Sequence, residues 1–143
     1  MKTTLLRRLA IVLGLTLAMP PLADATSNQE YKPDEYVVIT KGRAPNGQYS
    51  IAAHGEGDLG YDKFHLYLMD AATGKKIGPL TEIKDPLDTG ADAFYAQWSA
   101  DSREVSITYR VDRRVAMMVR YRIENRRATL INGPKKVSGI PGS

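Results

Sequence analysis

Two stretches of this 143-residue chain repeat one another, and the repeat constrains the fold more than any other feature of the sequence. Each copy begins with a turn-forming segment, continues through strand-like apolar residues and closes on a second turn, at 44–81 in the first copy and 98–134 in the second. A period of roughly 40–55 residues is typical of repeated β-sheet units rather than of solenoid helices. We therefore expect two similar groups of strands in one small domain.

The motifs of the two copies resemble TolB-type propeller repeats, whose blades carry a Trp-Ser-Pro-Asp-Gly turn, a Leu-Tyr-x-x-Asp strand and a Thr-Gly turn. The first copy contains Pro45-Asn46-Gly47, Leu66-Tyr67-Leu68-Met69-Asp70 and Thr73-Gly74; the second contains Trp98-Ser99-Ala100-Asp101-Ser102. The resemblance covers about residues 43–134 and implies scaffolding or docking in a bacterial envelope. Propellers use about four to eight blades. A two-blade chain is therefore expected to cap its own sheets, to dimerise or to dock on a partner.

The fold class predicted from the pattern is all-β, with antiparallel sheets made of two blade-like repeats in a small single domain. Segments rich in β-branched and aromatic residues alternate with Gly, Asn, Asp and Pro, as in strands separated by turns. The expected strands are Tyr36–Thr40, Tyr49–His54, Lys63–Asp70, Ala93–Trp98, Val105–Val111, Val115–Ile123 and Ala128–Ile131. Trp98 is expected to be a core residue, at the place where the resembling repeat puts an aromatic that packs between neighbouring blades.

The hairpin of the second repeat has a register that the sequence specifies. A three-residue loop at 112–114 pairs Val111 with Val115 and places eight apolar side chains on one face: Val105, Ile107, Tyr109, Val111, Val115, Met117, Val119 and Tyr121. A slip of one residue would mix arginines into that face, which is strongly disfavoured. The same register pairs Glu104 with Arg122 on the opposite face, where we expect an ion pair.

Residues 1–25 have the pattern of a secretory signal peptide. A basic start is followed by the apolar stretch Leu9–Met19 and by Ala23-Asp24-Ala25, a small-x-small cleavage pattern. About eleven apolar residues are too few for a membrane-spanning helix, which needs roughly 20. The expected organisation is a signal peptide at 1–25, a flexible segment at 26–35, the β domain at 36–134 and a flexible tail at 135–143. The mature protein is expected to be periplasmic or secreted, without membrane insertion.

Charge and arginine placement point to a protein partner. Removing the leader takes away three basic residues and one acidic residue, which lowers the formal net charge from +4 to +2 and leaves no strong field for nucleic acid. Arginines nevertheless cluster late in the chain, and the register above places several of them on the polar face. We take Arg110, Met118, Arg120 and Arg122 as the candidate interaction residues, for protein binding or self-association. An ordinary solvated face is the alternative.

Two acidic loops are the candidate metal sites, because Ca²⁺ prefers several oxygen ligands from flexible loops. Residues 55–62 contain Glu56, Asp58 and Asp62, and residues 85–92 contain Asp88 and Asp92. Neither loop has the ordered Asp-x-Asp-x-Asp-Gly spacing. A small ligand-binding or Ca²⁺-binding module is therefore the alternative function, and no cofactor is predicted.

The sequence contains few side chains that could act in catalysis. The chain has no Cys, only His54 and His65 as imidazole bases, and neither a Gly-x-Ser-x-Gly nor a His-Glu-x-x-His motif. The two histidines are expected on facing strands, at half-buried positions. The sequence thus favours an exported, non-catalytic protein that acts through protein contacts, with a hydrolase as a further alternative.

Overall fold

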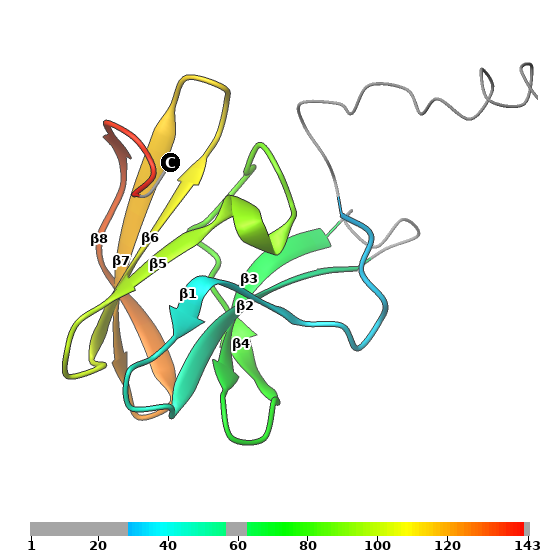
Figure 1. Ribbon diagram of the computed structural model, residues 1–143, viewed down its shortest axis with the longest axis vertical. Coiled ribbons are helices and arrows are strands. Elements are labelled where there is room, and N and C mark those ends of the chain that lie inside the picture. Colours follow the sequence, from blue (N-terminus) through cyan, green and yellow to red (C-terminus); the bar gives the residue numbers. More distant parts are fainter. Residues whose placement is uncertain (1–28, 57–62, 142–143) are drawn as a thin grey trace, which may run out of the picture.

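The computed structural model describes residues 29–56 and 63–141, and this part of the chain is all-β (Figure 1). Its elements are β1 (Val37–Arg43), β2 (Tyr49–Glu56), β3 (Lys63–Asp70), β4 (Lys76–Pro79), the 3₁₀ turn η1 (Ala91–Ala93), β5 (Tyr95–Trp98), β6 (Glu104–Arg110), β7 (Ala116–Glu124) and β8 (Arg127–Val137). All eight strands form one sheet in the order β4-β3-β2-β1-β5-β6-β7-β8, which curls into a half-barrel. The expected all-β single domain is confirmed.

Each sequence repeat lies in one four-stranded antiparallel meander, β1–β4 for the first and β5–β8 for the second, and the first strand of each meander ends where the repeated motifs begin. The meanders join where β1 and β5 run parallel, with Thr40 opposite Tyr95. At this junction the Thr40 backbone N–H donates to the Phe94 carbonyl oxygen at 3.2 Å. The sheet is therefore continuous and mixed, whereas the sequence predicted antiparallel pairing alone. The junction depends on how residues 80–94 return the chain beside β1, and no local pattern specifies that path.

The strands lie close to their expected positions, with two differences. The strand β4 was not predicted, because it is only four residues long and contains Gly78 and Pro79, which are poor strand formers. The strand β8 continues to Val137, three residues past the expected domain boundary. Its end pairs with the start of β7, where Lys135 lies opposite Met118 and Lys136 opposite Met117.

The register predicted for the second repeat is confirmed. Val105 pairs with Tyr121, Ile107 with Val119 and Tyr109 with Met117, while Glu104 lies opposite Arg122. The Val111 N–H donates to the Val115 carbonyl oxygen at 3.1 Å, which closes the three-residue loop. A buried face did fix the pairing, because any slip would have placed charged side chains in the core.

One hydrophobic core lies between the two meanders. The first repeat contributes Ile51, Leu66 and Leu68, and the second contributes Ile107, Val119 and Tyr121, all with at most 1% exposure. Phe94, fully buried just before β5, touches both sides: its ring centroid is 5.6 Å from that of Phe64 and 6.0 Å from that of Tyr109. Trp98 is half-buried, so the prediction that it is a core residue is met only in part: it packs against this core, and its Nε1 donates to the Gly42 carbonyl oxygen at 3.2 Å.

The repeat is also visible in two turns that need the left-handed backbone conformation. Gly47, between β1 and β2, has φ of 72°, and Ser102, at the matching place between β5 and β6, has φ of 61°. Glycine adopts this conformation freely, whereas other residues are strained in it. Ser102 nevertheless occupies this position, and its Oγ accepts a hydrogen bond from the Asn46 N–H of the first repeat at 3.0 Å.

The N-terminal segment packs on the domain, although the sequence predicted a flexible segment up to residue 35. Tyr31 is 6% exposed, its hydroxyl donates to the Thr89 carbonyl oxygen, and the Gln29 N–H donates to Thr89 Oγ1 at 2.7 Å. Burial raises the pKa of Tyr31 to about 12, so the phenol stays a donor at ordinary pH. The packed domain therefore begins near residue 29, before the expected boundary at 36.

The predicted signal peptide at 1–25 lies outside the described residues. Within the described part of the chain, no helix has the length and apolar character needed to cross a membrane.

Candidate functional site

The predicted interaction residues lie on the outer face of β6 and β7, turned away from the common core. Arg120 and Arg122 are exposed, and Arg110 and Met118 are half-buried. The Arg120 Nε donates to Ser106 Oγ at 3.0 Å. Within residues 29–56 and 63–141, no carboxylate forms an ion pair with Arg110 or Arg120. These guanidinium groups are therefore open to an acidic partner.

The ion pair expected between Glu104 and Arg122 does not form, although the two residues lie opposite one another as predicted. Arg122 Nε instead lies 3.9 Å from Glu124 Oε1, two residues along the same strand. Both side chains of that pair are at least half exposed, with 50% and 60% relative exposure, so the pair adds little stability. Register alone does not choose between two carboxylates that a long, flexible arginine can reach.

A shallow hollow of about 330 Å³ lies beside these arginines. Its lining comes from β5, β6 and the turn between them, with one arginine from β7: Gln97, Trp98, Ser99, Glu104, Ser106 and Arg120. The described residues expose two large hydrophobic side chains, Ile131 on β8 at 39% and Val38 on β1, opposite Ala52, at 49%. The outer face of the second repeat thus combines unpaired cations, a hollow and an exposed apolar side chain.

The matching face of the first repeat is covered. Ala52, Tyr67 and Met69 form a small second cluster there, at 1–6% exposure, with Tyr36 packed against it. The Lys76 ammonium lies 5.4 Å from the centre of the Tyr67 ring. The segment that precedes β1 therefore completes this face, and the described residues supply no such cover near Arg120.

His54 lies at the centre of the covered face and is fully buried, more deeply than the half-buried position predicted. Its ring stacks on Tyr36 with centroids 4.1 Å apart, and its Nδ1 lies 2.6 Å from the Glu35 carbonyl oxygen. Because a carbonyl oxygen only accepts, Nδ1 carries the proton. Among the described residues its Nε2 has no hydrogen-bond partner, and it lies 3.5 Å from Glu56 Oε1. His54 therefore holds the N-terminal segment to β2, and the aromatic residues at 31, 36 and 67 were the sequence signal for this cluster.

The candidate metal ligands are dispersed. Glu56 is exposed at the end of β2, Asp88 is half-buried in the linker and Asp92 is exposed in η1, while Asp58 and Asp62 lie outside the described residues. In the part of the chain that the structure describes, no three His, Cys, Asp or Glu side chains converge on a point that could hold a metal ion.

The two ends of the sheet, β4 and β8, leave a seam along the open side of the half-barrel. A groove of about 230 Å³ lies in it, lined by Leu68, Ile77 and Leu80 from the first repeat and by Arg126, Arg127 and Ala128 from the second. Sequence reasoning did not find this seam, because it exists only where the two repeats meet.

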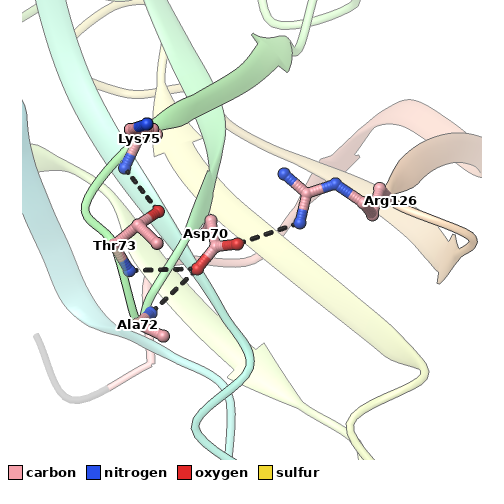
Figure 2. Close-up of polar contacts among 5 residues, drawn as sticks. All are labelled: Asp70, Ala72, Thr73, Lys75 and Arg126. Atoms are coloured by element: carbon pink, nitrogen blue, oxygen red, sulfur yellow. Dashed lines mark hydrogen bonds and ion pairs between the residues drawn. The ribbon is translucent and has the colours of Figure 1, made fainter.

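Two side-chain contacts bridge the seam. The Arg126 Nη1 donates to Asp70 Oδ2 at 2.9 Å, while Asp70 Oδ1 accepts from the Ala72 and Thr73 N–H groups (Figure 2). The hydrogen bond from Arg126, with those from the turn, holds the pKa of Asp70 below its usual value. The repeat motif residues at 70, 73 and 74 thus form a turn, and Arg126 of the second repeat binds it through Asp70.

The second bridge joins the buried Tyr121 of β7 to the linker that follows the first repeat. The Tyr121 hydroxyl donates to Glu82 Oε1 at 3.0 Å. Burial, and then the Glu82 carboxylate, raises the pKa of Tyr121, so the phenol remains protonated and keeps donating.

Comparison of the chain with protein-family models, with curated proteins and with solved structures finds no match in any of the three.

Proposed function

We propose that the chain is an exported, non-catalytic protein of propeller-like repeats that binds an acidic protein surface through the outer face of its second repeat. The observation that carries this proposal is the asymmetry between the repeats. The outer face of the first repeat is covered over β2 and β3, where Tyr36, just before β1, packs on Ala52, Tyr67 and Met69, while Arg120 and Arg122 on the second stay exposed.

The basic charge of the outer face of the second repeat indicates an acidic partner. Arg110 and Arg120 have no carboxylate partner in the described chain, and the pair of Arg122 with Glu124 is long and solvent-exposed. Arginine forks bind carboxylates in two-pronged geometry. Aspartate and glutamate side chains of another protein therefore fit this surface.

The neighbouring surface supports a protein rather than a free carboxylate as the partner. Exposed Ile131 and half-buried Met118 flank the arginines with apolar area. Interfaces typically combine an apolar centre containing Met and aromatic residues with arginine anchors. The TolB-like motifs support a docking role in the envelope as an expectation carried over from the resemblance.

The absence of cysteine from the chain allows a direct test. Thr129→Cys places a unique thiol on the exposed side of β8, where a photo-crosslinker can be attached to the mature protein. Illumination in an envelope extract is expected to give a defined adduct whose yield falls as salt rises, because exposed charge pairs are screened.

Two controls make the test specific to this face. Thr73→Cys, exposed on the β3–β4 turn of the first repeat, should give no such adduct. Adding Arg120→Glu to Thr129→Cys should abolish the adduct without changing the melting temperature. Equal yields at positions 73 and 129, or an adduct that survives Arg120→Glu, would overturn the proposal.

A further inference from the structure

The seam between β4 and β8 contains a free strand edge that differs from the proposed docking face. β8 pairs with β7 on one side only, and β4 with β3 on one side only, so both strands end the sheet. Unpaired edges expose backbone N–H and C=O groups that can accept an added strand. Native proteins usually block such edges with lysine, proline or short strands.

The blocking devices are present on most of the two edges and absent from one window. β4 is four residues long, starts at Lys76 and ends at Pro79. The far half of β8 carries Pro134, which has no N–H to donate, followed by Lys135 and Lys136. Residues 127–132, at the start of β8, contain neither proline nor lysine, and the pairing with β7 stays regular until it shifts between Leu130 and Asn132. The edge is therefore regular and open over residues 127–130.

The geometry of the β7–β8 hairpin fixes which backbone groups face outward in this window. Asn125 and Arg126 have φ of 51° and 59°, the pattern of a two-residue hairpin turn, and Glu124 lies opposite Arg127. In such a hairpin the residues that close the turn bond to each other, and the next residues alternate. Ala128 and Leu130 thus direct their N–H and C=O groups away from β7.

The groove meets the start of the window, at Arg127 and Ala128, and its far side is lined by half-buried Ile77 together with Leu68 and Leu80, which are only 1–2% exposed. Arg127 is exposed and has no ion pair within the described residues, whereas Arg126 is already held by Asp70. A bound segment would therefore meet an available cation and Ile77 at the start of the window.

We propose that this seam binds an extended peptide segment of another protein, which adds as a strand along residues 127–130 of β8 and places an acidic residue at Arg127. Main-chain hydrogen bonds supply affinity in this mode, and alternate side chains supply specificity. A second copy of this chain fits poorly: both free edges carry only basic charges, Lys76 on β4 and Arg127, Lys135 and Lys136 on β8. Like charges on facing strands are destabilising.

The test uses the mature, isotopically labelled protein and the synthetic peptide Glu-Val-Thr-Val-Thr-Glu, which offers an acidic residue in either strand direction. Binding is expected to shift the backbone amide resonances of Ala128 and Leu130 and to slow their hydrogen exchange. Arg127→Glu should weaken the affinity by about two- to fivefold, the scale of one exposed ion pair. Arg114→Glu, on the exposed tip of the 112–114 loop, is the matched control and should leave binding unchanged.

Peptide variants separate strand addition from simple charge attraction. Glu-Val-Pro-Val-Pro-Glu lacks two N–H donors and should not bind, and a peptide with Lys at both ends should bind more weakly. Retained binding of the proline peptide, or no amide shift at roughly 1 mM peptide, would overturn the proposal. Shifts confined to residues 106 and 118–122 would also overturn it, but would favour the docking face above. Thr129 and Ile131 lie near both surfaces, so the two proposals are separated by the arginine variants: Arg127→Glu should weaken only peptide binding, and Arg120→Glu should abolish only the crosslinked adduct.

Discussion

The two repeats have the same order of strands but bury them differently. In the first, six consecutive residues of β2 are buried, Ser50 to Gly55, so both faces of the strand are covered. In the second, the matching strand β6 has only three consecutive buried residues, Ile107 to Tyr109, and the rest of its outer face is half-buried. A shared sequence motif therefore specifies the meander, but not how many of its faces are covered.

The difference arises from chain outside the repeat. The first repeat is preceded by a segment whose Tyr36 stacks on His54 and whose Glu35 carbonyl accepts from that ring. The second repeat follows the linker at 80–94, which supplies Phe94 to the common core. An uncovered, arginine-bearing face in the second repeat is the result, and the predictions below test how far the two repeats differ.

The largest effect is expected from Phe94→Ala, because this ring contacts both repeats in the common core. Loss of a fully buried phenylalanine costs about 3–5 kcal/mol. Chemical denaturation followed by Trp98 fluorescence and by far-ultraviolet circular dichroism should shift in one cooperative step. If the two signals separate, the repeats unfold independently and do not share one core. Phe94→Leu is the control and should cost less, since it leaves a smaller cavity.

A smaller effect is expected from Tyr36→Ala, which uncovers the outer face of the first repeat. The lost stacking and partial burial should cost about 1–3 kcal/mol. Hydrogen exchange at the amides of Ala52 and His54 should accelerate, while protection in β6 and β7 changes little. Tyr36→Phe keeps the stack and should behave like the wild type. Unchanged protection at residues 52 and 54 would show that the cover does not depend on this ring.

Gly47 and Ser102 allow the same turn to be compared in both repeats. Gly47→Ala should cost about 1 kcal/mol, because φ of 72° is unfavourable for alanine although the added methyl meets only the Arg43 side chain. Ser102→Ala keeps the strain and removes the hydrogen bond to the Asn46 N–H, at a cost of about 0.5–1.5 kcal/mol. Ser102→Gly relieves the strain and should be nearly neutral. Equal losses for Ser102→Ala and Ser102→Gly would show that backbone strain is negligible there.

The smallest effect concerns the ion pair between Asp70 and Arg126 at the seam. Asp70→Asn keeps an oxygen for the Ala72 and Thr73 N–H groups, so it removes little besides the charge. The folded-state pKa of Asp70 is lowered, so its contribution to stability is complete above the unfolded value of about 4 and is lost as the pH falls through the folded value. The melting temperature of Asp70→Asn should lie slightly below that of the wild type at pH 7, and the gap should close below about pH 4. A gap that persists in acid would have a cause other than the charge.

The amino-acid sequence by itself determined the local pattern of this protein. The repeat predicted two groups of strands, and the alternation in the second hairpin predicted its register residue by residue, from Val105 opposite Tyr121 to Val111 bonded to Val115. These features follow from side chains close together in the chain, where an error of one residue would bury charge. Local chemistry was therefore sufficient.

Only the tertiary structure decided how the repeats meet. The parallel pair of β1 and β5, the burial of His54 beneath residues 31–36, and the seam between β4 and β8 join segments that are distant in the sequence. The pairing of Arg122 with Glu124 rather than with Glu104 also depended on the side-chain conformations in the folded protein. Such contacts are selected by the packing of whole meanders around one core, and many pairings of distant segments satisfy the same local pattern.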